Sequence, residues 1–197
     1  MQSVRRTVGM LGLAAVLAGS ASAQETRGIV IQGNAGIHHG LLTLDRNGTY
    51  NTDTGLTFGG ALGYQITQNL VFRADVNYAS TPINFNGAPL GSDLTRLYAA
   101  GVAQIQFPGH SVNPYFLVGA GAVFLNQHAT AEPKQTKGAG LVGSGLGFGL
   151  GGGLSLFGET RVYVYQARGF VGNALTDPRV QLDWTFGGGL SYAFGSK

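Results

Sequence analysis

A glycine-rich motif is the first feature of the sequence that could carry chemistry. The segment Gly147-Phe148-Gly149-Leu150-Gly151-Gly152 fits the G-x-G-x-x-G pattern with which some enzymes bind a dinucleotide. That function needs a helix directly after the glycines, because the helix N-terminus binds the pyrophosphate. Residues 153–157 instead have the pattern of a strand and lead into a turn. We therefore expect no cofactor, and we interpret the glycines as small residues that permit curvature and close approach in a narrow β-structure.

The four histidines are the second candidates for chemistry. His38 and His39 are adjacent, so on a strand they point to opposite faces and are poorly placed to share a metal ion. His110 and His128 fall in connections at opposite ends of the predicted structure. A site that combines His38 or His39 with His128 is the alternative left open, although exposed loop histidines fit the sequence better. We expect no metal site and no catalytic residue.

Polar residues at every second position mark the clearest structural element, the segment from Leu70 to Ala79. Arg73, Asp75 and Asn77 fall on one face of an extended strand, because successive side chains point to opposite faces. The other face carries Leu70, Phe72, Ala74, Val76 and Tyr78. A shift of one residue would move the arginine and the aspartate to the apolar face, so the register is firmly set.

Further segments bring the predicted number of strands to eight. The last segment, residues 180–194, alternates in the same way, with Asp183 on the polar face and Trp184 on the apolar face. The other alternating segments are residues 28–38, 54–65, 95–107 and 161–168. Two more segments, residues 114–125 and 141–157, are so rich in glycine and apolar residues that their facing stays open.

The connections between these strands alternate between short and long. The short ones are residues 66–69, 108–113 and 158–160, and the long ones are residues 39–53, 80–93, 126–138 and 169–179. Short periplasmic turns and longer extracellular loops are typical of transmembrane barrels. The prediction is therefore an all-β fold: an eight-stranded antiparallel up-and-down transmembrane β-barrel.

The first residues have the features of a secretory leader. Arg5 and Arg6 precede an apolar stretch over residues 8–17, and Ala21-Ser22-Ala23 is an A-x-A cleavage site. The apolar stretch is shorter than the roughly 20 residues that a spanning helix needs. We expect residues 1–23 to be a cleaved signal peptide and residues 24–197 to form an outer-membrane β-barrel domain.

Composition excludes several classes of protein. The 12 basic and 9 acidic residues give a net charge of +3, which falls to +1 once the two leader arginines are removed, so a nucleic-acid partner is not indicated. The absence of cysteine excludes a disulfide scaffold and a thiolate metal site. A soluble lipocalin-type barrel is the main alternative fold, but it would place Arg73 and Asp75 in an apolar ligand cavity.

The polar faces of the strands predict a barrel interior that is filled by a polar network. Its expected members are Arg73, Asp75, Asn77, Gln104, Gln106, Gln166, Arg168 and Asp183. Buried charges must be paired, so we expect Arg73 and Arg168 each to lie within reach of Asp75 or Asp183. Side chains fill a barrel of about eight strands, so a wide pore is not expected.

The end of the sequence resembles a known assembly signal. Gly189, Tyr192 and Phe194 have the spacing by which outer-membrane barrels are handed to the barrel assembly machinery. The segments Gly63–Leu70, Pro114–Gly121 and Gln166–Arg168 look like those of small barrels of the OmpA, OmpX and Ail kind. The resemblance implies a fold and the outer membrane of a Gram-negative-type bacterium. Its members include structural barrels, adhesins and occasional lipid-modifying enzymes.

The function expected from these observations is a non-enzymatic outer-membrane barrel that presents four extracellular loops. The partners expected are outer-membrane lipid and lipopolysaccharide, which Arg46, Lys134, Lys137 and Arg179 could contact. One alternative is a lipid A modifying enzyme, which needs a histidine with a serine or carboxylate at the lipid-facing outer rim. The other is a small-solute channel. The oligomeric state is left open.

Overall fold

The computed structural model describes residues 28–41, 50–109, 112–127, 134–168, 170–171, 174–175 and 178–194. Every regular element in these ranges is a β-strand, and none contains a helix long and apolar enough to cross a membrane. The predicted signal peptide over residues 1–23, together with Arg46, His110 and His128, lies outside the described residues.

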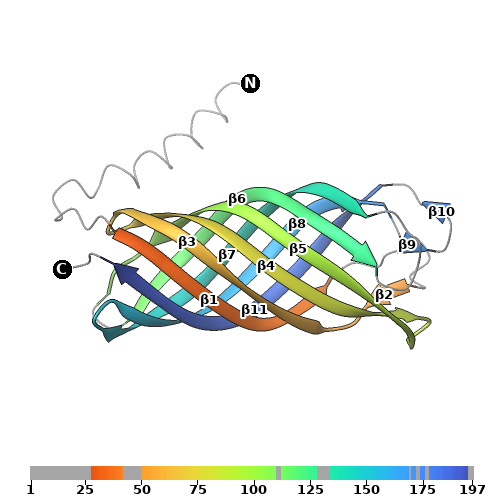
Figure 1. The fold of residues 1–197 in the computed structure, drawn as a ribbon, viewed down its shortest axis with the longest axis horizontal. Helices are drawn as coiled ribbons and strands as arrows, with labels where there is room; N and C mark the ends of the chain where they lie inside the picture. The colour runs from red at the N-terminus through yellow and green to blue at the C-terminus, as the bar shows by residue number, and fades with distance from the viewer. Residues whose placement is uncertain are drawn as a thin grey trace, which may run out of the picture.

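Eight long strands form a closed antiparallel barrel, as the sequence predicts (Figure 1). They are β1 (Gly28–Gly40), β3 (Gly55–Thr67), β4 (Leu70–Phe85), β5 (Ala88–Gln106), β6 (Val112–Gln127), β7 (Gln135–Gly151), β8 (Leu154–Ala167) and β11 (Arg179–Phe194). Each strand pairs with its neighbours along the chain, and the pairing of β1 with β11 closes the ring. Closure removes the free edges at which open sheets aggregate.

The two ends of the barrel differ. One end, here called the turn end, holds the connections β3–β4, β5–β6 and β7–β8, with the start of β1 and the end of β11. The opposite end, here called the loop end, holds three short strands: β2 (Tyr50–Thr52), β9 (Phe170–Val171) and β10 (Ala174–Leu175) (Figure 1). This arrangement agrees with the predicted alternation of short and long connections except at residues 158–160 and 80–93.

One predicted turn is wrong. Residues 158–160 were expected to connect two strands, but they lie inside β8, and the turn lies at Gly152 and Gly153. Gly151, Gly152 and Gly153 have φ angles of 94°, 61° and 83°, which side chains rarely adopt. The tight turn therefore needs these glycines, whereas Gly158 and Thr160 are ordinary members of a strand. No helix follows the G-x-G-x-x-G motif, because β8 begins at Leu154.

A second predicted connection is more ordered than expected. Residues 80–93, predicted as a loop, are the paired ends of β4 and β5, and the hairpin turns at Asn86 and Gly87. Their φ angles of 50° and 80° suit a tight hairpin, for which Asn-Gly is a preferred sequence. The strand β2 pairs with the same hairpin through Tyr50 and Phe85. The ladder thus continues beyond the barrel at the loop end.

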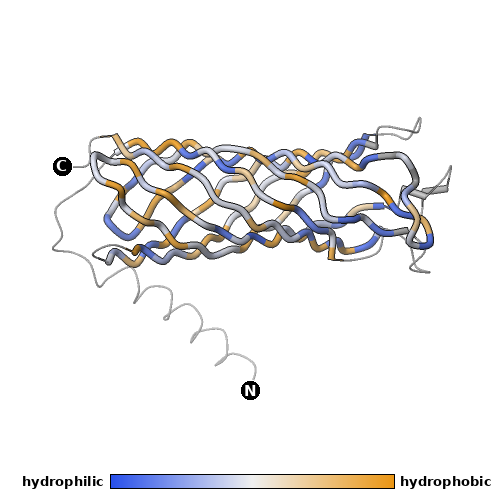
Figure 2. The backbone as a smooth tube through the Cα atoms, turned by 90° about the horizontal axis from the view of Figure 1, so that it is seen from below, coloured by the Kyte–Doolittle hydropathy of each residue, from blue (hydrophilic) through white to orange (hydrophobic). Residues whose placement is uncertain are grey.

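The outer surface is apolar and the interior contains the charged groups. Exposed apolar side chains occur on all eight long strands, among them Ile31, Phe58, Phe72, Leu97, Phe116, Leu146, Leu156 and Phe186. Figure 2 shows the alternation of hydrophobic and hydrophilic residues along the strands. Asp93 and Arg168, which are exposed, both lie toward the loop end. This polarity is the reverse of that in a lipocalin-type barrel.

The turn at Gly152 provides a test of the backbone argument. An added Cβ at Gly152 or at Gly138 meets nothing within 4 Å, but only Gly152 has a positive φ. We expect Gly152→Ala to lower the free energy of unfolding by about 1–2 kcal/mol, and Gly138→Ala to change it by less than about 0.5 kcal/mol. Urea unfolding of the refolded barrel measures both. Equal effects would contradict a conformational role for Gly152.

Candidate functional site: the charged core of the barrel

Two arginines and two carboxylates meet in the turn half of the interior. Arg73 on β4 donates to Asp75 from Nε at 2.9 Å and from Nη2 at 2.5 Å. Its Nη1 donates to Gln104 at 2.8 Å and to Glu159 at 3.3 Å. Arg161 on β8 pairs with Glu159 and lies 3.2 Å from Asp75. The four charges alternate in sign, so each buried charge has opposite charges beside it.

Tyr115 on β6 completes this group. Its hydroxyl donates to Glu159 Oε2 at 3.1 Å. The ring lies against Gly145 on β7, where an added Cβ would come within 2.4 Å of the phenol. A side chain at Gly145 would therefore displace the ring. We call Arg73, Asp75, Gln104, Tyr115, Glu159 and Arg161 the Glu159 cluster; its members come from β4, β5, β6 and β8.

A second group surrounds Asp183 on β11, nearer the loop end. Its Oδ2 accepts hydrogen bonds from Tyr98 at 2.5 Å and Tyr165 at 2.6 Å, and it lies 3.1 Å from Arg96 Nε. Arg96 also donates to Thr81 at 2.6 Å. His38 completes the group: its Nε2 lies 3.1 Å from the Tyr98 hydroxyl and 3.6 Å from Asp183. We call His38, Thr81, Arg96, Tyr98, Tyr165 and Asp183 the Asp183 cluster.

Stacked tyrosines join the two clusters. The rings of Tyr98 and Tyr163 are 4.0 Å apart, and the Tyr163 hydroxyl accepts a hydrogen bond from Arg161. Apolar side chains fill much of the remaining interior, among them Ile83, Leu94, Leu117, Val123, Leu125 and Leu141. The interior is therefore less polar than the sequence suggests. Two ionic clusters are embedded in a packed core.

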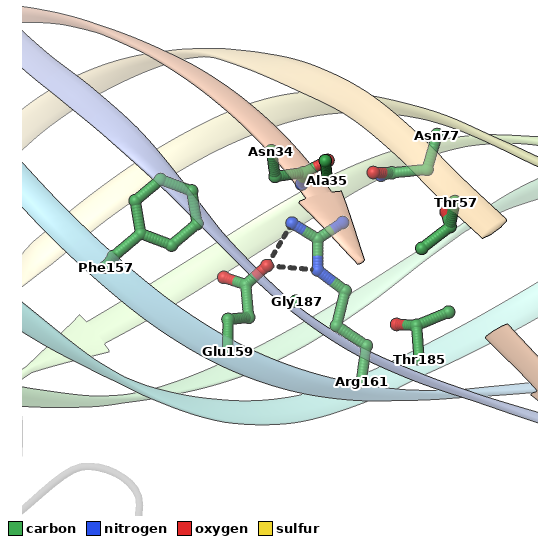
Figure 3. Close-up of a pocket in the computed structure, with 9 residues that line it drawn as sticks. All are labelled: Asn34, Ala35, Thr57, Asn77, Phe157, Glu159, Arg161, Thr185 and Gly187. Atoms are coloured by element: carbon green, nitrogen blue, oxygen red, sulfur yellow. Dashed lines mark hydrogen bonds and ion pairs between the residues drawn. The ribbon is translucent and has the colours of Figure 1, made fainter. Parts of the chain in front are cut away.

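The space left beside Arg161 is small. Figure 3 shows Arg161 directed toward Glu159, with Asn34, Thr57, Asn77 and Thr185 around them. The cavity that these residues line measures about 20 Å³, close to the minimum for one water molecule. It provides no passage for a larger solute at this level of the barrel.

The predicted interior residues lie in different parts of the barrel. Arg73, Asp75 and Gln104 meet in the Glu159 cluster, and Asp183 forms the centre of the other cluster. Asn77 is buried and lines the small cavity. Gln106 lines a separate hollow at the turn end.

The prediction that Gln166 and Arg168 lie in the interior is wrong. Both are exposed, and Tyr163, Tyr165 and Ala167 are buried in their place. The tyrosines point inward because their hydroxyls bond to the charged groups. Gln166 and Arg168 lie at the loop end of β8, where a polar side chain on the outer face reaches water. The expected pairing of Arg168 with an interior aspartate is therefore also wrong, and Arg96 and Arg161 pair there instead.

Three charged members of the two clusters are absent from the set predicted from the sequence. Arg96 has the same parity as Tyr98 and Gln104 in its strand, so the alternation could have found it. Arg161 has the parity of Tyr163 and Tyr165, so the predicted interior position of Gln166 and Arg168 assigned it to the wrong face. Glu159 was missed because its segment was interpreted as a turn.

The two described histidines lie on opposite faces of β1. His38 is completely buried, which corrects the expectation of an exposed loop residue. His39 lies on the outer face, and its Nδ1 is 3.2 Å from the Thr54 hydroxyl. No cluster of potential metal ligands occurs in the ranges that the structure describes.

A closed antiparallel barrel with an apolar outer surface and a charged, filled interior is a transmembrane β-barrel. The chain belongs to the outer membrane protein beta-barrel domain family, whose model matches residues 10–197. This membership implies the outer membrane as its location.

Solved structures of outer-membrane proteins share the fold. Neisserial surface protein A is 16% identical, with a TM-score of 0.63 over 84% of this chain and 97% of that chain. The outer membrane protein OprG from Pseudomonas aeruginosa is 12% identical, with a TM-score of 0.62 over 88% of this chain and 99% of that chain. No curated protein sequence matches significantly. At these identities the likeness establishes the fold alone.

A comparison of two arginines tests the corrected assignment of the interior. Arg96 is 1% exposed and pairs with Asp183, whereas Arg168 is exposed. At pH 8, where histidine is ordinarily neutral, Arg96→Met should lower the free energy of unfolding by about 3–5 kcal/mol, because it leaves a buried carboxylate without its cation. Arg168→Met should change it by less than about 0.5 kcal/mol. Equilibrium unfolding in lipid vesicles measures both, and a comparable loss in the two variants would contradict the assignment.

Proposed function

We propose that this protein is a non-enzymatic outer-membrane barrel whose rigid, closed core supports surface elements that interact with lipid or with other molecules. The Glu159 cluster carries the proposal. Its side chains come from four strands and meet in the lumen, so the barrel has the construction of a scaffold. The Asp183 cluster lies nearer the loop end, and buried apolar side chains pack around both clusters.

The β4–β5 hairpin is the surface element that the core supports most directly. Leu94 and Ile83 are buried at its base, and Thr81 connects that base to Arg96 of the Asp183 cluster. Ladder pairs continue as far as Phe85 and Ala88, and β2 adds a further strand. A hairpin held in this way presents its tip in a fixed position, which suits recognition.

Export and orientation form part of the proposal. The leader over residues 1–23 would direct the chain through the inner membrane, and Gly189, Tyr192 and Phe194 on β11 would present the chain to the barrel assembly machinery. The turn end would then face the periplasm and the loop end the exterior, as in other barrels with short periplasmic turns. Lys134, which is exposed at the loop end, would meet the anionic groups of lipopolysaccharide. Lys137 and Arg179 share a strand face with the inward-facing Leu141 and Asp183, so the proposal does not include them.

The lipid A modifying alternative has one supporting observation, the contact of His39 with Thr54 at the outer rim. Nucleophilic catalysis by a hydroxyl also calls for a third group that orients the histidine. Thr54 is the side-chain partner of His39 within the described ranges. A non-enzymatic role therefore accounts for the described residues better.

A conductance measurement distinguishes the proposed scaffold from a small-solute channel. The refolded protein in a planar lipid bilayer should produce no sustained conductance steps, because ion pairs and packed side chains occupy the lumen. A wide porin reconstituted in the same lipid is the positive control. Stable unitary steps from the wild-type protein would overturn the proposal in favour of the channel.

A further inference from the structure

A hollow at the turn end of the barrel is not used by the functions considered above. It has a volume of about 260 Å³ and opens beside the turns that contain Gln68, Pro108 and Gly153. Its polar walls are dominated by carboxamides: Gln32, Gln65, Gln68, Gln104, Gln106 and Asn113. None of the described residues that line it is charged. We call this hollow the glutamine vestibule.

The Glu159 cluster fixes the floor of the glutamine vestibule. The Oε1 atom of Gln104 accepts the hydrogen bond from Arg73 at 2.8 Å, which orients the amide. The charge of Arg73 is balanced by Asp75 and Glu159, so the floor presents no uncompensated charge to a ligand. A charged ligand would enter this hollow without a partner of opposite sign, and that favours an uncharged one.

Gln32 on β1 contributes another carboxamide to the lining of the hollow. Its Nε2 lies 3.4 Å from the Ser191 hydroxyl, while its Oε1 is buried and has no hydrogen-bond partner among the described residues. The Gln32 carboxamide is therefore held against the wall of the hollow beside Ser191.

We propose that the glutamine vestibule binds a short, uncharged glycan from the periplasmic side. Each carboxamide offers a donor and an acceptor a short distance apart, and sugar hydroxyls and acetamido groups both donate and accept. Pro108 and Ala193, which are not buried, supply apolar surface for the C–H faces of a sugar ring. The periplasmic side of this inference rests on the orientation of the barrel given in the proposed function. The binding chemistry does not depend on what the loops recognise.

Sugar binding to the refolded full barrel in phosphatidylcholine nanodiscs tests this inference. Glycosidic detergents and lipopolysaccharide are left out, because their sugars have the proposed chemistry. Maltotriose and tri-N-acetylchitotriose are the probes, and N-acetyl-triglycine amide is an uncharged amide that lacks sugar hydroxyls. Titration is followed by calorimetry and by the side-chain amide resonances of the glutamines. We expect at least one of the two sugars to bind and to shift the resonances of Gln32, Gln65 and Gln106.

Leucine variants locate the site. Gln65→Leu and Gln106→Leu each remove hydrogen-bonding groups from the vestibule while keeping a similar volume, and we expect each to weaken sugar binding by about two- to tenfold. Gln166→Leu, an exposed glutamine at the other end of the barrel, is the matched control and should leave binding unchanged. Circular dichroism and the unfolding midpoint establish that each variant is folded.

Three outcomes would overturn the inference. The first is that neither sugar binds to the folded wild-type barrel. The second is that N-acetyl-triglycine amide binds as tightly as the sugars. The third is that Gln166→Leu weakens binding as much as the vestibule variants do. None of these outcomes bears on bilayer conductance, so the proposed function would stand or fall separately.

Discussion

Compensation of buried charge is the constraint on which the rest of this structure depends. An eight-stranded barrel is narrow enough for side chains to fill its interior, so a charge placed there has little water to stabilise it. Arg73 and Arg161 therefore alternate with Asp75 and Glu159, and Arg96 pairs with Asp183. Tyr98 serves the same need, because its hydroxyl donates to Asp183 while its ring stacks on that of Tyr163.

The same constraint determines the register of the sheet. A one-residue shift of β4 or β8 would carry arginines and carboxylates to the apolar outer face, so the ionic core and the lipid-facing surface specify one arrangement together. Glycine at position 145 belongs to this arrangement, since it leaves room for the Tyr115 ring that reaches Glu159. A closed core also separates the two ends of the barrel. The hairpin at the loop end and the glutamine vestibule at the turn end can thus serve different ligands.

Local alternation made much of the fold predictable from the sequence. In β4, the alternation of Arg73 and Asp75 with Phe72 indicated which side chains face the interior. In β11, the alternation of Asp183 with Trp184 did the same. Alternation failed in β8, because tyrosine suits both a lipid-facing and a core-facing position, and only its cross-barrel partners decide between them. Glu159 was missed for a related reason: Gly-Glu-Thr resembles a turn until the positive φ angles of residues 151–153 show where the chain reverses. Pairing across the lumen joins residues as distant as Arg73 and Glu159, and no local pattern contains it.

A double-mutant cycle on Glu159 and Arg161 in lipid vesicles tests the central claim most directly. The two side chains are ion-paired and nearly completely buried. The account predicts that Glu159→Leu and Arg161→Met each lower the free energy of unfolding by about 3–5 kcal/mol, while the double variant loses far less than the sum, because no uncompensated charge remains. Losses that add to within about 0.5 kcal/mol would contradict the account, since they would show that the two charges do not depend on each other.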